Sequence, residues 1–386
     1  MLDLLTNPLV TLIAGALVGG VFTHYFEKAT ASTERRFRIL RRRTKVAKEE
    51  RWDTDGYDGD LRITTLAPLI PPIDWGDTRD NLRVPIRSRP FFLVPVADLR
   101  NTLDTAEFPQ TEDVLPPNFH AFFADRPEAL ETLEKRRREV TQFFAEKAHG
   151  SYFNGRKYGV LSTDPHGRTA DVGELPVLRI EVYDTDYFTQ KVMERVRPTL
   201  DELVGTPERG QTLAQLNGRR SIFRNSLGLS IVVELTSTDQ IILTRRAADA
   251  SYSEGKRWWY VSATEAVSQS DFDRQSKEVD LFDAVHRGVK EELGVERRDI
   301  AEIRFLSAFF ENNFFQDNLV VVVELKETVD ITELRRRYAK DQAVEVSELH
   351  TLGRSRKRIQ EWVSAHRDEA RPQTIYTLQC YSQLGI

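Results

Sequence analysis

The chain of 386 residues contains a single cysteine, Cys380, and this scarcity excludes several classes of protein. One thiol is too few for a disulfide framework, a four-cysteine zinc site or an iron–sulfur cluster. Glycine and proline, with 20 and 16 residues, are too few for a collagenous or low-complexity chain. The seven histidines are scattered without metal-ligand spacing. The net charge of −5 gives no reason to expect a nucleic acid polymer as partner.

Charge is also missing from a long segment near the amino terminus. Leu4 to Phe26 are 23 consecutive residues without a charged side chain. As a helix rising about 1.5 Å per residue they span about 34 Å, enough to cross a hydrocarbon core of about 30 Å. A cleaved signal peptide starts with basic residues, whereas Asp3 precedes this run, and a buried core helix is the other alternative. We expect residues 1–27 to form a transmembrane helix in the lipid bilayer.

Basic residues are concentrated directly after this run. Residues 28–51 contain ten Lys or Arg and three Glu, a net charge of +7, so we interpret residues 28–52 as a basic juxtamembrane stem. The positive-inside rule places the amino terminus outside the inner membrane and the rest in the cytosol. The stem suits anionic lipid head groups and, equally, a solvated helix. Removing this +7 and the −2 of Asp3 and Glu27 from −5 leaves −10 for residues 52–386.

Small residues recur at every fourth position of the predicted transmembrane helix. They are Thr11, Gly15, Gly19 and Thr23, which include one GxxxG pair. A strip of small residues lets two helices approach closely, and van der Waals packing then drives association in lipid. This pattern predicts a homo-oligomer, although glycines are frequent in membrane helices for other reasons as well.

The remainder divides into two regions joined by a polar linker at 205–218. Periodicity and turn residues predict a mixed α+β middle region, residues 53–204, whose role the sequence does not indicate. Within it we expect helices over 127–147 and 187–204 and strands near 157–162 and 177–188. The C-terminal region, residues 219–386, has a mixed α/β pattern. Its expected strands are 228–237, 240–246, 258–267, 302–311 and 318–326, and its expected helices are 281–295, 331–341 and 357–366.

The most informative segment of the C-terminal region is Arg287 to Val295, which reads RGVKEELGV. On a helix, Gly288, Glu291 and Glu292 share one face. Adjacent carboxylates suit Mg²⁺, which prefers oxygen ligands and is often shared with a substrate phosphate. Arg287 is placed to orient Glu291 at i+4. The alternative is an ordinary exposed helix with i,i+4 ion pairs.

This segment resembles the second half of the Nudix box, whose pattern ends in Arg-Glu-(aliphatic)-x-Glu-Glu-x-Gly-(aliphatic). The resemblance extends over residues 225–370 and implies a Nudix-like α/β/α sandwich. Gly288 departs from the pattern, because the family has a metal-binding glutamate at this position. The glycine and the glutamate of the first half would fall at Asp273 and Val279, and Ser262-Ala263 replaces the usual Gly-Gly. Loss of one carboxylate is expected to weaken Mg²⁺ binding by Glu291 and Glu292 and the activation of water.

A pocket in such a fold can bind a nucleotide without cleaving it. Trp258, Trp259 and Tyr260 are candidates for stacking on a base, with core packing as the alternative. Arg245, Arg246 and Arg287 are candidates for phosphate contacts, with exposed strand-end charges as the alternative for the first two.

One amino-terminal membrane helix followed by a degenerate Nudix domain resembles the transmembrane–Nudix effectors of bacterial cyclic-oligonucleotide antiphage signalling. The resemblance implies an effector of antiviral defence in which a cyclic nucleotide binds the Nudix-like domain and oligomerisation disrupts the inner membrane. Two other functions stay open. One is a membrane-tethered, Mg-dependent Nudix hydrolase of a nucleoside diphosphate derivative that uses Glu291 and Glu292. The other is a non-catalytic scaffold.

Overall fold

The protein was analysed as a computed structural model. The structure describes residues 57–58, 61–67, 82–87, 90–93, 119–120, 123, 126–147, 154–168, 176–204, 213–218, 221–246, 258–341 and 346–384. The predicted transmembrane helix with Thr11, Gly15, Gly19 and Thr23, and the basic stem, lie outside these residues. Within them no helix is long and apolar enough to cross a membrane.

A nine-stranded mixed sheet forms the centre of the C-terminal region. Its main path runs β1-β2-β12-β13-β6-β7-β14, with β8 beside β7 and β9 beside β6. Only β6 and β13 pair in parallel, and every residue of β6 is buried, as expected for a central strand covered on both faces. The strands are β1 (Tyr57–Asp58), β2 (Ile63–Ala67), β6 (Leu227–Leu235), β7 (Gln240–Arg246), β8 (Trp259–Val261), β9 (Ala263–Ala266), β12 (Ile300–Glu311), β13 (Gln316–Leu325) and β14 (Val346–Gly353).

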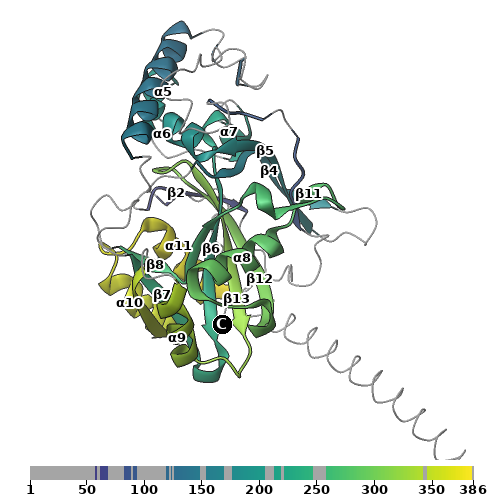
Figure 1. The fold of residues 1–386 in the computed structure, drawn as a ribbon, viewed down its shortest axis with the longest axis vertical. Helices are drawn as coiled ribbons and strands as arrows, with labels where there is room; N and C mark the ends of the chain where they lie inside the picture. The colour runs from purple at the N-terminus through teal and green to yellow at the C-terminus, as the bar shows by residue number, and fades with distance from the viewer. Residues whose placement is uncertain are drawn as a thin grey trace, which may run out of the picture. The chain divides into compact units, whose positions relative to one another are not determined.

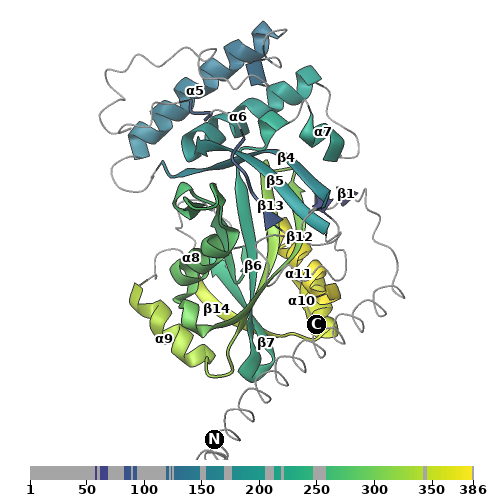
Figure 2. The same cartoon turned by 90° about the vertical axis from the view of Figure 1, so that its right-hand side faces the viewer.

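Helices cover both faces of this sheet (Figure 2). Helices α8 (Leu281–Leu293) and α9 (Ile331–Asp341) pack on one face, in the same hydrophobic cluster as Leu229 and Ile231. Helices α10 (Arg356–Ala365) and α11 (Pro372–Leu384) pack on the other, in the cluster that contains Val232. Alternate residues of β6 therefore contribute to two separate cores.

Helix α8 has strong signals at both ends. The Asp280 side chain accepts hydrogen bonds from the backbone N–H groups of Phe282 and Asp283, which satisfies donors of the first turn. Gly294 ends the helix with a positive φ of 67°, a conformation that glycine adopts without strain. The helix that carries the Nudix-box resemblance is therefore fixed by its own sequence.

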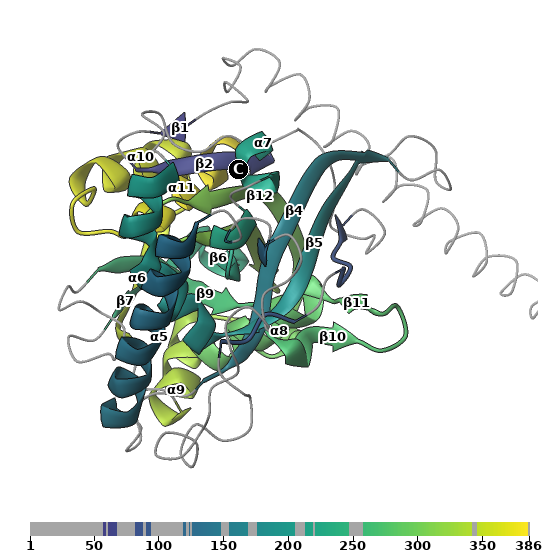
Figure 3. The ribbon, with the colours of Figure 1, turned by 90° about the horizontal axis from the view of Figure 1, so that it is seen from above.

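The middle region combines two helices and a small sheet. Strands β4 (Arg156–Arg168) and β5 (Pro176–Asp186) form a long antiparallel hairpin, and β3 (Leu82–Arg83) pairs in parallel with β5. Helices α5 (Pro127–Lys147) and α6 (Tyr187–Val204) pack together beside it (Figures 1 and 3). Both helices have the predicted bounds.

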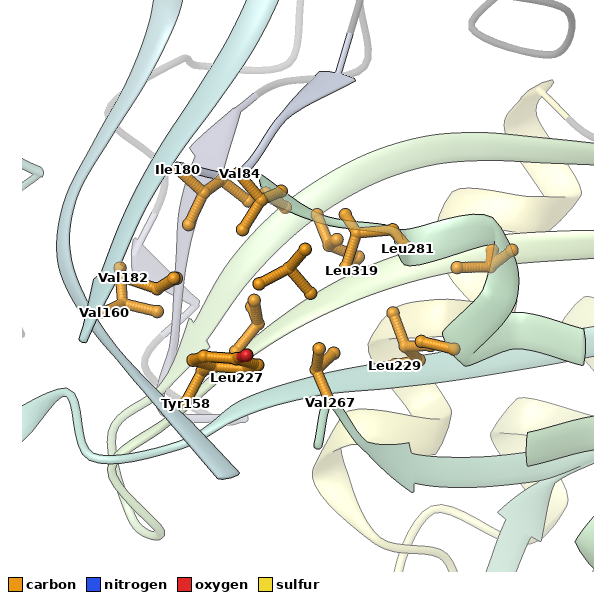
Figure 4. Packing of buried hydrophobic residues seen from close by; sticks show 14 of the residues in the cluster. Val84, Tyr158, Val160, Ile180, Val182, Leu227, Leu229, Val267, Leu281 and Leu319 are labelled. Carbon is orange, nitrogen blue, oxygen red and sulfur yellow. The ribbon is translucent and has the colours of Figure 1, made fainter. Parts of the chain in front are cut away.

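One hydrophobic cluster joins the middle and C-terminal regions (Figure 4). Val160 and Val182 of the hairpin share it with Leu227 and Leu319 of the large sheet. Short elements also connect the regions: α7 (Leu213–Asn217), a 3-10 turn at Ser221–Phe223 and the hairpin of β10 (Phe272–Asp273) and β11 (Glu278–Val279).

Four details differ from the sequence-based prediction. Strand β2, from the expected middle region, pairs with β12 in the large sheet, so a boundary at residue 204 does not separate the regions fully. The single strand expected over 258–267 is two strands, because the Ser262 hydroxyl bonds Val233 N–H and the Ile242 carbonyl between β6 and β7. Helix α11 and strand β14 were not predicted. The mixed α+β class is confirmed.

Candidate functional site

Arg287, in the middle of helix α8, is the centre of a cluster of ion pairs. Its guanidinium lies 2.8 Å from a carboxylate oxygen of Glu265, 2.9 Å from one of Asp271 and 3.3 Å from one of Glu291. It also donates to the carbonyl of Ala266 at 2.9 Å. Burial opposes the charged guanidinium, but the bonds to Asp271 and the charge of Glu265 outweigh it and raise the pKa of Arg287. Arg287 therefore holds the segment before α8 in place and is occupied by protein carboxylates.

Gly288 lies where the resemblance expects a metal-binding glutamate, and the space beside it is filled. A Cβ atom at this position would lie 2.9 Å from Cβ and 3.0 Å from Cγ of Glu265, both too close for real Cβ contacts. The side chain of Glu291 is 57% exposed, and Glu292 is half-buried. Within the described residues, no three His, Cys, Asp or Glu side chains form a group that could hold a metal ion. The helix places Glu291 and Glu292 as expected, and the Glu265 carboxylate shares the Arg287 guanidinium with Glu291.

Burial also perturbs Glu265 itself. Desolvation raises the pKa of the Glu265 carboxyl, and the charge of Arg287 only partly opposes the increase. Its side chain is 17% exposed, and Arg287 is the ion partner that the structure gives it. The Glu265 side chain thus fills the space where a glutamate is expected at position 288, and its carboxylate is ion-paired with Arg287.

The nucleotide-binding residues predicted from the sequence fall into two separate groups. Arg245 stacks over the Trp259 ring at 5.1 Å and lies 3.7 Å from Glu369. Trp259 packs edge-on against Trp362, with ring centroids 6.0 Å apart, in the cluster beneath α10 and α11. Helix α8, with Arg287, packs on the opposite face of the sheet. The structure does not bring Trp259 and Arg287 into one pocket.

The other two residues of that prediction are less informative. Trp258 is half-buried directly before β8, and Arg246 ends β7, where its backbone pairs with Val346. The side chain of Arg246 lies outside the described part of the structure.

A different cluster, which the sequence analysis missed, surrounds Arg371 at the start of α11. Arg371 forms a two-point ion pair with the fully buried Glu311, at 2.7 and 3.2 Å. Its guanidinium lies over the rings of Phe314, at 4.4 Å, and Tyr260, at 6.0 Å. Burial disfavours its charge, but Glu311 outweighs this and raises the pKa of Arg371. The result is a guanidinium that Glu311 holds in place beside two aromatic rings.

Amide side chains complete this Arg371 cluster. The Gln316 carbonyl oxygen accepts from Arg371 at 3.3 Å, and the Gln373 amide donates to Asn318 at 3.3 Å. The carbonyl oxygen of Gln373 is buried, and no described residue donates a hydrogen bond to it. Gly228 makes room here, because a Cβ atom would collide with the amides of Gln316 and Asn318. A buried acceptor without a donor is costly, so this oxygen is a polar group of the cluster that its protein neighbours leave unsatisfied.

Strand β4 of the middle region lies against the segment that precedes α8. Lys157 of β4 is paired with Ser268, and the Tyr158 N–H donates to the carbonyl of Val267 at 3.4 Å. The Lys157 ammonium bonds the carbonyl oxygen of Gln190, and burial lowers its pKa to about 8, although Glu194 opposes the shift. The ion cluster around Arg287 is thus covered on one side by β4.

These features define a mixed α+β protein with one large sheet, a helix whose Arg287 is ion-paired, and a cluster of aromatic and amide groups around Arg371. No protein-family model matches the chain, and no curated protein matches it either.

Proposed function

We propose that this chain is a membrane-anchored effector of antiphage defence that senses a cyclic nucleotide through a Nudix-like C-terminal domain. In this proposal the amino terminus lies outside the inner membrane, the body is cytosolic, and oligomerisation disrupts the membrane. The Arg371 cluster is the binding site. The observation that carries the proposal is the buried Gln373 carbonyl oxygen beside a stacked arginine.

The chemistry of the cluster suits a nucleobase. Bases stack on aromatic rings and on guanidinium planes, which Phe314, Tyr260 and Arg371 supply together. Amide groups offer one acceptor and two donors each, as needed to read the edge of a base. Gln316, Asn318 and Gln373 therefore account for specificity, while the aromatic and guanidinium planes account for affinity.

Two features support binding without cleavage. Gly288 removes one carboxylate of the resembled motif, and Glu265 occupies the adjacent space. Arg287 is held by Glu265 and Asp271. Should Mg²⁺ bind at Glu291 and Glu292, it would polarise a phosphate oxygen. The exposure of Glu291, which leaves its carboxylate accessible to a metal ion, is the observation that favours the alternative hydrolase function.

Calorimetric titration of the full chain in detergent with cyclic di-AMP, cyclic di-GMP and cyclic tri-AMP tests the proposal. We expect one of them to bind and Arg371→Met to weaken binding by about tenfold or more, the size of a lost hydrogen bond to a charged group. Arg245→Met, which removes the cation stacked on Trp259, is the matched control and should bind normally. If Arg245→Met loses binding and Arg371→Met does not, the binding site lies at Trp259 instead.

A kinetic assay separates sensing from hydrolysis. The protein should turn over nucleoside diphosphate derivatives with Mg²⁺ far more slowly than the ~1–10³ per second of typical enzymes. Turnover in that range that Glu291→Gln abolishes would refute the sensor and establish the hydrolase.

A further inference from the structure

Residues 312–318, here called the shared loop, contact two parts of the protein at once. Phe314, Gln316 and Asn318 contribute to the Arg371 cluster. Their neighbours in the chain contact the middle region and the short elements that follow it. Residues 312–315 form a turn, and β13 begins at Gln316, so successive side chains from Gln316 onwards point to opposite sides of the strand.

The contacts on the second side are specific. The guanidinium of Arg197, on α6, lies 4.3 Å over the Phe315 ring and donates to the carbonyl of Asn313 at 2.9 Å. Phe315 also stacks on Phe223, with centroids 5.0 Å apart. Helix α6 is therefore attached to the loop by a hydrogen bond and a cation–π contact.

Asp317 extends this connection to the β4–β5 hairpin. It forms a buried ion pair with Arg224, whose Nε lies 3.0 Å from one carboxylate oxygen. Arg224 in turn donates to the Thr163 hydroxyl on β4, and its carbonyl accepts from Val160 N–H at 2.7 Å. Arg224 and Asp317 are both almost fully buried, so a shift of Asp317 has no solvent-filled space to absorb it.

We propose that the shared loop couples occupancy of the Arg371 cluster to helix α6 and the β4–β5 hairpin. A ligand that hydrogen-bonds Arg371 or Gln373 competes with Gln316 and Asn318, which bond these two residues in the ligand-free protein. Its binding therefore shifts the first residues of β13. Asp317 and Phe315 move with the same backbone and carry the change to Arg224 and Arg197. This inference rests on the proposed nucleotide site, and it assigns the middle region the role of reading that site.

Hydrogen exchange of the full chain in detergent tests the coupling without a ligand. Arg371→Met removes the contacts with Glu311 and Gln316 on the binding side, and we expect amide exchange in Tyr187–Val204 to rise about twofold or more. Arg245→Met is the control: it removes the cation stacked on Trp259 and paired with Glu369, close to Arg371 in the structure, and should leave α6 unchanged. If Arg371→Met unfolds the domain, Gln316→Ala, which keeps the Arg371–Glu311 pair, replaces it. Unchanged exchange in α6 in the folded variant would overturn the proposal.

Cyclic di-AMP, cyclic di-GMP and cyclic tri-AMP serve as probes for the ligand arm. The one that binds should alter exchange in both the shared loop and α6. Arg197→Ala should still bind it but reduce the response of α6. Arg195→Ala is the matched control, because Arg195 lies on the same helix over Phe143 and not on the shared loop. Binding with no response in α6, or an equal response in Arg197→Ala, contradicts the coupling.

Failure of the two proposals gives different results. If none of the three probes binds, the sensor function fails, and the ligand-free comparison alone decides the coupling.

Discussion

Gly288 packs against Glu265 so closely that a Cβ atom at position 288 would lie 2.9 Å from the Cβ atom of Glu265. The contact explains why the departure from the Nudix-box pattern at this position is not a simple exchange of side chains. The backbone of α8 approaches β9 at the point where a glutamate would need room. A carboxylate cannot be restored there without moving the helix or the strand.

Gly288→Ala should therefore destabilise the protein. The Cβ atom of Glu265 is fixed by the backbone and cannot rotate away, and overpacking of this kind costs about 1–3 kcal/mol of unfolding free energy. Urea denaturation measures the change. Gly353→Ala is the matched control, because its Cβ would meet Arg358 at an ordinary 3.6 Å. Equal stability of the two variants would show that α8 is free to shift.

Local patterns explain why most elements were predicted from the sequence. Helix 331–341 and helix 187–204 have the expected bounds because their apolar residues repeat at the helical period. Helix α11 escaped prediction because its buried positions include Gln373, Thr374 and Thr377, which look like surface residues in a sequence. Strand β2 escaped because it pairs with β12 more than 200 positions later in the chain.

The candidate site was predictable only in part. Gly288 signalled a missing carboxylate, but no pattern indicated that Glu265 fills the space beside it. Tyr260, Glu311 and Arg371 come from three distant segments with no characteristic spacing, so only tertiary structure brings them together. The mixed α+β class is confirmed, and the Nudix-like sandwich, the membrane helix and the nucleotide ligand stay predictions.

Removal of Arg287 should leave its carboxylate partners buried without a cation. We expect Arg287→Met to lower the unfolding free energy by on the order of 2–3 kcal/mol near neutral pH. Arg297→Met is the control: Arg297 forms an exposed pair with Asp283, and its loss should cost less than about 1 kcal/mol.

The deficit of Arg287→Met should depend on pH. The pKa of Glu265 is already raised by burial, and loss of the opposing charge of Arg287 raises it further. A raised pKa means that the folded state holds the proton more tightly, so stability is retained below the unfolded value of about 4.3 and lost as pH increases through the folded value. Unfolding in urea should show a smaller loss of unfolding free energy for Arg287→Met at pH 5 than at pH 7.5. A loss that does not depend on pH would exclude Glu265 as its source.

The buried Lys157 should change stability with pH in the opposite direction, at alkaline pH. Its pKa is lowered by burial to about 8 in the folded protein, from 10.5 in the ordinary case. Between these values the unfolded chain binds more protons, so stability from this group rises with pH by up to about 1.4 kcal/mol per pH unit. Lys157→Met should flatten the stability profile between pH 8 and 10.5. Lys191→Met, on α6 beside Glu194 and partly exposed, should leave the slope in place.

Toxicity to the host cell should depend on the strip of small residues in the predicted transmembrane helix. Gly19→Leu places a bulky side chain among Thr11, Gly15 and Thr23 and should hold two helices apart. Insertion should not suffer, because leucine favours the membrane by a few tenths of a kcal/mol. Nucleotide binding, measured by calorimetry, should stay intact because the proposed site is in the C-terminal region. Loss of membrane potential and ligand-dependent oligomerisation should disappear.

Gly20→Leu is the matched control for this strip. It makes the same chemical change one position further along, about 100° around the helix from Gly19, and so leaves the strip of small residues open. Cells with Gly20→Leu should depolarise like wild type when the cognate nucleotide is supplied. If cells with Gly19→Leu also depolarise, the strip is incidental, and assembly must come from the rest of the chain.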